Sequence, residues 1–143
     1  MYQVTIYTDG ACSKNGAKNA IGGYGAIIIC GEHQKIVRGN AIGTTNNRME
    51  LTAVIAAVLA LTKPCQIQVV TDSQYVIQGT KSMRAWLEKK DLPNRDLWLQ
   101  LIEAGNKGGH KMKFIKVAGH TGDVYNEQCD RIAREQIRKA VLG

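Results

Sequence analysis

Residues 47–73, NRMELTAVIAAVLALTKPCQIQVVTDS, predict a helix that is followed directly by a strand. The part up to Thr62 is rich in Ala, Leu, Met and Glu, which favour helix, and Lys63-Pro64 ends it. Residues 66–71 then predict a short strand that ends at Asp72. A helix that leads into a strand in this way is typical of a crossover connection in an α/β protein.

Three strands are predicted before this helix. Residues 2–8 alternate between two faces, and Asp9-Gly10 ends that strand. Residues 13–25 are rich in Gly, Asn and Lys, which predicts an irregular connection. Two further strands cover 25–30 and 35–43 with a short turn between them, so the first part of the chain is predicted to be an antiparallel meander.

The remainder of the chain completes the order βββαβααβα. Weaker helical patterns cover 74–90, with Gly79 interrupting them, and a second helix covers 96–104. Residues 111–117 alternate as a fifth strand, and 125–141 predict a last amphipathic helix. We therefore expect an α/β fold with one five-stranded mixed sheet and helices on both faces. A chain of 143 residues is expected to form one domain, residues 1–143.

Composition excludes several classes of protein. The chain is 44% apolar and 22% charged, which is typical of a soluble globular protein. Its longest apolar run, residues 53–61, is too short to cross a bilayer, and the N-terminus lacks the pattern of a signal peptide. The four cysteines form neither a CxxC pair nor a zinc-spaced cluster, so we expect reduced thiols in a cytoplasmic protein without a membrane partner.

The net charge of +7 indicates a polyanionic partner. Much of the basic charge follows Gly79 and lies around Trp86 and Trp98, a mixture that suits a phosphate backbone. The basic residues of this segment are Lys81, Arg84, Lys89, Lys90 and Arg95.

Four carboxylates stand where structural acids are not expected. Asp9 and Asp72 lie at predicted strand ends, where functional groups of mixed sheets gather. Glu50 and Asp130 share the apolar, inward faces of their helices, where an unpaired carboxylate is costly. Each acid alone could be a cap or turn residue, but four together repel one another unless a multivalent cation is present. Oxygen ligands of this kind favour Mg²⁺ or Mn²⁺.

The chain resembles the type 1 ribonuclease H family in four blocks that occur in order over residues 2–138. The blocks are TDGACSKNG around Asp9, TTNNRMEL around Glu50, VTDSQYVIQG around Asp72, and VAGHTGDVYNEQCDRIA, which contains His120 and Asp130. The resemblance implies a ribonuclease H-like fold and an endonuclease that hydrolyses the RNA strand of RNA–DNA hybrids. It also implies two Mg²⁺ ions, for which Mn²⁺ can substitute, and products with 5′-phosphate and 3′-hydroxyl ends.

The same resemblance implies roles for individual residues. The catalytic and metal-ligating acids are Asp9, Glu50, Asp72 and Asp130, and His120 is a mobile proton shuttle. Contacts to the 2′-hydroxyl groups that distinguish RNA from DNA fall on Cys12, Asn15, Asn46 and Gln74, and on Glu50 itself. Asn47 belongs with the substrate-binding residues. Thr45 and Asn94 resemble a pocket for a phosphate of the DNA strand, although both could equally cap helices.

Two stretches depart from the best-known bacterial pattern. The segment between Gly79 and Asp96 is shorter by several residues, and Met83 and Leu87 stand where those enzymes have tryptophans. Trp86 could provide the missing apolar wall for the DNA strand, or it could be a core residue. The loop at 17–21 is longer than in that pattern.

Three alternatives stay open at this point. The chain could bind hybrids without catalysis, or it could be a strand-transferring recombinase or junction nuclease of the same fold. It could also be the nuclease domain of a polymerase, but the Met1 start and the end at Gly143 favour a free-standing enzyme, which we expect to be a monomer.

Overall fold

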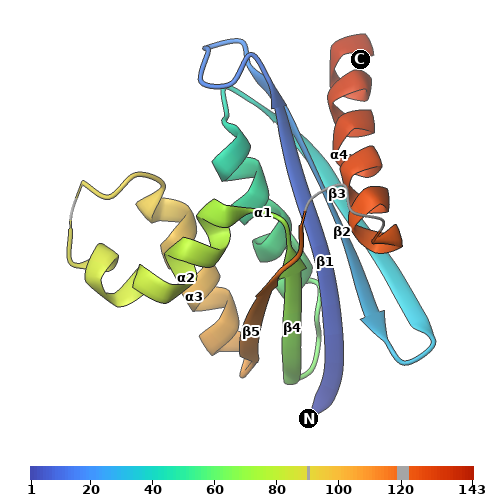
Figure 1. Cartoon of the computed structure of the whole chain (residues 1–143), viewed down its shortest axis with the longest axis vertical. Coiled ribbons are helices and arrows are strands. Elements are labelled where there is room, and N and C mark those ends of the chain that lie inside the picture. Colours follow the sequence, from blue (N-terminus) through green and yellow to red (C-terminus); the bar gives the residue numbers. More distant parts are fainter. Residues whose placement is uncertain (90, 119–122) are drawn as a thin grey trace.

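The computed structural model describes residues 1–89, 91–118 and 123–143, except for the side chains of Arg84 and Trp86. Within these residues the order βββαβααβα is confirmed (Figure 1). The strands are β1 (Tyr2–Ser13), β2 (Ile21–Cys30), β3 (His33–Ile42), β4 (Cys65–Thr71) and β5 (Lys111–Lys116). The helices are α1 (Asn46–Leu59), α2 (Gln74–Leu87), α3 (Arg95–Gly108) and α4 (Val124–Leu142). None of these helices has the length and hydropathy that a bilayer crossing requires.

The strands form one mixed sheet in the order β3-β2-β1-β4-β5. Strand β2 is antiparallel to β1 and β3, and β4 is parallel to β1 and β5. The meander and the crossovers expected from the sequence are therefore both present. Strand β1 is central, so its residues are flanked by β2 on one side and β4 on the other.

The prediction for the first two strands was wrong in its boundaries. Strand β1 does not end at Asp9 but continues to Ser13, and β2 begins at Ile21. The added residues pair with one another, for example Asp9 with Gly25. Glycine is a poor strand former in general, so the Gly-rich start of β2 was mistaken for a loop. Asp9 thus lies inside a strand and not behind one.

The glycines of β2 allow helices to approach both faces of the sheet. A Cβ at Gly22 would meet the Thr44 and Met49 side chains at 2.4 and 2.6 Å, on the α1 side. A Cβ at Gly23 would lie 2.1 Å from the carbonyl oxygen of Ala133 in α4. Figure 1 shows the result, with α4 on one face of the sheet and α1, α2 and α3 on the other.

Gly79 does not interrupt α2. A Cβ at this position would lie 2.1 Å from the Trp98 ring, so the helix passes close to α3 only because the side chain is absent. Trp98 is one of the largest fully buried side chains. Gly79 is therefore a packing residue, and the helix continues through it at the modest cost of glycine in a helix.

Candidate metal centre

The register of β1 and β4 brings Asp9 and Asp72 together. The parallel pairing ends at Tyr7 and Val70. Asp9 stands two residues after Tyr7 within β1, and Asp72 stands two residues after Val70, directly beyond the end of β4. Beyond this point β1 continues to Ser13 paired with β2, whereas β4 ends at Thr71. The expectation that functional acids gather at this end of the sheet agrees with this arrangement.

Glu50 reaches the same place from helix α1. The helix begins at Asn46, and its N-cap residue Thr45 accepts a hydrogen bond from the Arg48 backbone N–H at 3.1 Å. The first turns lie directly against β1 at Gly10, where a Cβ would be 2.5 Å from the Glu50 backbone nitrogen. The Glu50 side chain lies beside Asp9 and Asp72 and is only 8% exposed.

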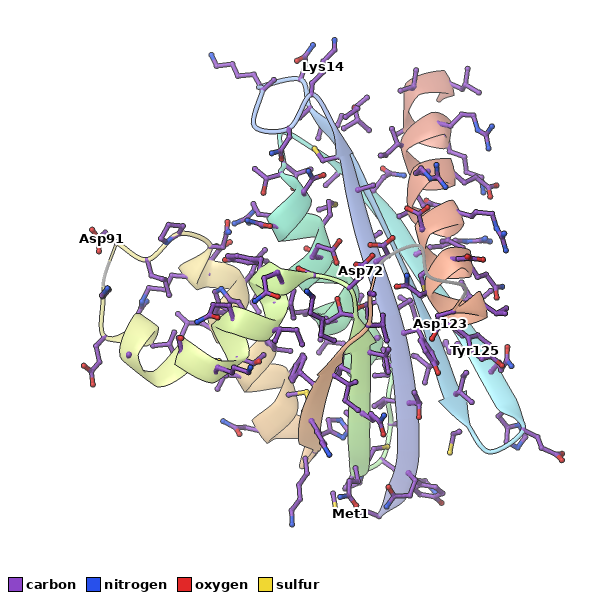
Figure 2. The ribbon with its side chains drawn as sticks, viewed as in Figure 1. Met1, Lys14, Asp72, Asp91, Asp123 and Tyr125 are labelled. Atoms are coloured by element: carbon purple, nitrogen blue, oxygen red, sulfur yellow. The ribbon has the colours of Figure 1, made fainter. Side chains whose placement is uncertain are left out.

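The three carboxylates form a compact cluster. One oxygen of each of Asp9, Glu50 and Asp72 lies within 4.8 Å of the other two. They line an open cleft of about 530 Å³, and Figure 2 shows Asp72 near the middle of the molecule. Within the described residues, no lysine or arginine forms an ion pair with any of the three.

Burial and crowding shift the protonation of this cluster. Burial, followed by the charge of Asp9, raises the pKa of Glu50 to about 10. Burial also raises the pKa of Asp9 to about 7, although a hydrogen bond with Glu50 opposes that shift. Without a cation, Glu50 therefore keeps a proton at neutral pH, in a hydrogen bond with Asp9. The Oε2 atom of Glu50 is buried and has no hydrogen-bond partner among the described residues.

These features fit a divalent cation. A buried carboxylate oxygen without a partner is costly, and a nearby metal ion would both occupy it and release the retained proton. The donors are all oxygen atoms, which suits Mg²⁺ or Mn²⁺ better than zinc. The cluster is thus an acidic group that could hold a metal ion.

Asp130 lines the same cleft but is held differently. It comes from α4, its side chain is 18% exposed, and it forms an ion pair with Arg134 one turn further along the helix. It does not belong to the group of three whose oxygens lie within 4.8 Å of one another. The structure therefore brings all four acids to one cleft and distinguishes three close ones from a fourth that has a cationic partner.

Four of the candidate substrate-binding residues also line the cleft: Cys12, Asn46, Asn47 and Gln74. Asn15 does not line it but accepts a hydrogen bond from the Asn46 backbone N–H at 2.8 Å. This bond ties the loop after β1 to the start of α1.

Thr45 and Asn94 lie beside the cleft and are connected through Arg48. The Arg48 guanidinium donates to Asn94 Oδ1 at 3.3 Å and pairs with Asp96 at 2.8 Å. Asn94 is the N-cap residue of α3, as the alternative interpretation of the sequence allowed, but its backbone is left-handed and its side chain makes no capping hydrogen bond. Its amide instead donates to the Tyr75 hydroxyl at 3.0 Å.

Two predicted site residues lie outside what is described. His120 falls in the undescribed residues 119–122, and the side chain of Trp86 is likewise outside the description. Met83 and Leu87, which the sequence resemblance places at tryptophan positions, are partly buried and pack against the core.

Sequence reasoning missed Tyr75, Arg48 and Arg134. Tyr75 lines the cleft, and its hydroxyl accepts hydrogen bonds from Asn94 and from Trp98. Of these three, only Arg134 could have been found from the sequence. It stands four residues after Asp130 on a predicted helix, which is the spacing of a helical ion pair.

The raised pKa values predict a pH-dependent stability in chelator. Asp9 and Glu50 bind protons in the folded chain that the unfolded chain has released above about pH 4. The free energy of unfolding should therefore be largest at acid pH and fall as pH rises through 7 toward 10. Urea unfolding of the wild type and Glu50→Gln at pH 5 and pH 9 in EDTA checks this.

Glu50→Gln should show a smaller loss of stability between the two pH values than the wild type, because one titrating group is absent. Saturating Mg²⁺ should also reduce the loss in the wild type. Equal pH dependence for the two proteins in EDTA would contradict the assignment of a retained proton to Glu50.

Comparisons with known proteins agree on one family. A family model described as RNase H matches residues 1–138. Ribonuclease H of Clostridium botulinum (strain Hall) is 42% identical over 146 aligned positions, which cover 94% of this chain and 95% of the relative. Ribonuclease H of Acidovorax sp. (strain JS42) is 43% identical over 151 positions, covering 100% and 99%.

A solved structure shows the same architecture. LC9-RNase H1, a type 1 RNase H with the type 2 active-site motif, matches with a TM-score of 0.83 and 26% sequence identity. The match covers 96% of this chain and 73% of that one.

Proposed function

Because this chain belongs to the ribonuclease H family, we propose that it hydrolyses the RNA strand of RNA–DNA hybrids at the carboxylate cleft, in a reaction that requires two Mg²⁺ ions. Mn²⁺ can substitute for Mg²⁺, and the products carry 5′-phosphate and 3′-hydroxyl ends. The enzyme is further proposed to act as a cytoplasmic monomer. The alternatives of a recombinase or of a binding protein without catalysis have no observation in their favour.

Two observations together carry the proposal. The carboxylates of Asp9, Glu50 and Asp72 crowd together, and Oε2 of Glu50 is buried without a hydrogen-bond partner among the described residues. A protein that only bound nucleic acid would gain nothing from buried negative charge, because that charge repels phosphate. A hydrolase gains a place for cations beside the scissile phosphate.

Each acid is proposed to have a distinct place in this site. Asp9, Glu50 and Asp72 would be the close ligands, and Asp130 would complete the set from the other side of the cleft. Divalent ions held there would activate the attacking water and stabilise the leaving oxygen of the phosphodiester. The buried setting of Asp9 and Glu50 fixes their oxygens before the substrate arrives.

Substrate selection is proposed to lie with the polar residues around the acids. Cys12, Asn46 and Gln74 line the cleft and Asn15 supports Asn46, so these groups are placed to contact 2′-hydroxyls of the RNA strand. Glu50 would also contact a 2′-hydroxyl, and Asn47 would join the same surface. Thr45 and Asn94, joined by Arg48, would receive a phosphate of the DNA strand. Trp86 is proposed to line the DNA-strand channel.

The direct experiment uses end-labelled duplexes. An RNA–DNA hybrid should be cut in its RNA strand in Mg²⁺ and left intact in EDTA, while matched double-stranded RNA and double-stranded DNA should stay intact in both. Cleavage of the hybrid that persists in EDTA, or equal cleavage of all three duplexes, would exclude the proposed function.

His120 is proposed to move protons during attack or product release. His120→Ala should lower turnover by roughly 10²-fold, and by no more than about 10⁴-fold, with hybrid affinity nearly unchanged. Steady-state kinetics together with equilibrium binding measure the two quantities separately. If affinity falls strongly and turnover is retained, His120 is a binding residue instead.

A further inference from the structure

Helix α4 carries a row of three exposed arginines that none of the assignments above uses. Arg131, Arg134 and Arg138, here called the arginine row, stand three and four residues apart and therefore share one side of the helix. With Glu135 they line one shallow hollow in the surface.

The arginine row begins at the carboxylate cleft. Arg134 pairs with Asp130, which lines the cleft, and Arg138 is two turns beyond Asp130. At 1.5 Å per residue, Arg138 lies roughly 12 Å along the helix axis from Asp130. This distance corresponds to about three to four base pairs of a duplex. The row is thus next to the cleft and long enough to follow a nucleic acid that leaves it.

The charges at either end of the row have no ion-pair partner among the residues that the structure describes. Glu127 and Glu135 lie four residues before and after Arg131, the spacing of a helical ion pair, yet neither pairs with it in the described part of the chain. Instead, Oε1 of Glu135 lies 3.7 Å from Nζ of Lys139. Arg138 likewise has no acidic partner among the described residues. Two guanidinium groups therefore remain available for an external anion.

The opposite side of the cleft carries positive charge too. Helix α2 lies on the face of the sheet that α4 does not cover (Figure 1). Lys81 in this helix and Lys89, two residues after its end, are both exposed. A duplex centred on the carboxylates could therefore meet basic residues on both sides. Arginine suits the α4 side because its planar guanidinium can bind a phosphate with two parallel hydrogen bonds.

We propose that the arginine row is a second contact surface for the phosphate backbone of the bound hybrid, on the α4 side of the cleft. The proposal rests on the proposed function, since it takes the hybrid to be the ligand of the cleft. Arg131 and Arg138 provide the phosphate contacts. Arg134 remains engaged with Asp130 and is left unchanged in the test.

The test compares the salt dependence of hybrid binding for Arg131→Gln/Arg138→Gln and its parent, both in an Asp72→Asn background that prevents cleavage. The slope of log affinity against log salt should become flatter by about 0.9 for each contact, or about 1.8 for the pair. The control is Lys35→Gln/Lys107→Gln, which removes the same charge from exposed residues of β3 and the end of α3. That control should leave the slope close to the parental value.

A second series uses hybrids shortened from one end or the other. The difference in salt slope between the arginine variant and its parent should vanish when the hybrid is shortened from the end that contacts the arginine row. It should persist when the hybrid is shortened from the other end. An unchanged slope in the arginine variant overturns the proposal, and so does an equal change in the lysine control. Cleavage of the full-length hybrid by the wild type is measured in parallel. If the wild type cleaves the hybrid but the arginine variant keeps the parental salt slope, the contact surface is refuted and the proposed function is not.

Discussion

Replacing Asp72 with Asn is expected to reduce hybrid cleavage in Mg²⁺ by roughly 10³-fold or more, with the fold preserved. Asp72 is one of three carboxylates within 4.8 Å, and the substitution keeps its shape while it removes its charge. Loss of a residue that only supports a metal ligand costs about 10- to 100-fold, so loss of a ligand should cost more. Single-turnover kinetics at saturating enzyme measure the effect.

Stability should respond in the opposite direction. Removing one negative charge relieves the repulsion among Asp9, Glu50 and Asp72, so the melting temperature of Asp72→Asn in EDTA should equal or exceed that of the wild type. Asp91→Asn is the matched control, because Asp91 is exposed and lies far from Asp72 in Figure 2. Asp91→Asn should leave both the cleavage rate and the melting temperature unchanged. Near-normal cleavage by Asp72→Asn would contradict its role as a metal ligand.

Gly10→Ala should impair both folding and catalysis. The added methyl group would lie 2.5 Å from the Glu50 backbone nitrogen and from the Met49 carbonyl carbon, and backbone atoms cannot move aside as a flexible side chain can. Overpacking of this kind costs about 1–3 kcal/mol of unfolding free energy. The first turns of α1 should also shift, and a displacement of about 1 Å at a catalytic group can lower the rate by about 10²-fold.

Gly105→Ala is the control for this substitution. Its methyl group would meet only the end of the Met112 side chain, at 2.8 Å, and alanine favours helix over glycine. Urea unfolding and single-turnover cleavage should show little loss for Gly105→Ala and a large loss for Gly10→Ala. If Gly10→Ala keeps full activity, the position of Glu50 does not depend on close contact between β1 and α1.

Much of the architecture could be predicted from residue patterns alone. The order of the elements follows from alternation in the strands and from the apolar helix that ends at Lys63-Pro64. The inward position of Glu50 was also foreseen, because its helical neighbours are apolar, and the residue is buried as expected. Periodicity reports burial well since it depends only on which residues share a face.

Features that depend on glycine or on distant side chains could not be predicted in this way. The Gly-rich start of β2 looks like a loop in the sequence, although it pairs with β1 and makes room for α4. Gly79 similarly looks like a helix breaker, and its role appears only once Trp98 is seen beside it. The hydrogen bonds from Asn94 and Trp98 to Tyr75 join residues far apart in the chain, which local patterns do not report.

The central claim, that the carboxylate cluster binds divalent metal ions, is tested most directly by calorimetric titration of Mn²⁺ into the protein at neutral pH. Binding should be saturable and accompanied by release of protons, because Glu50 loses the proton that it holds in the metal-free state. Binding should be weakened strongly in Asp9→Asn, because Asp9 is buried and supplies one of the three clustered carboxylates. Equal Mn²⁺ affinity for the wild type and Asp9→Asn would contradict the account.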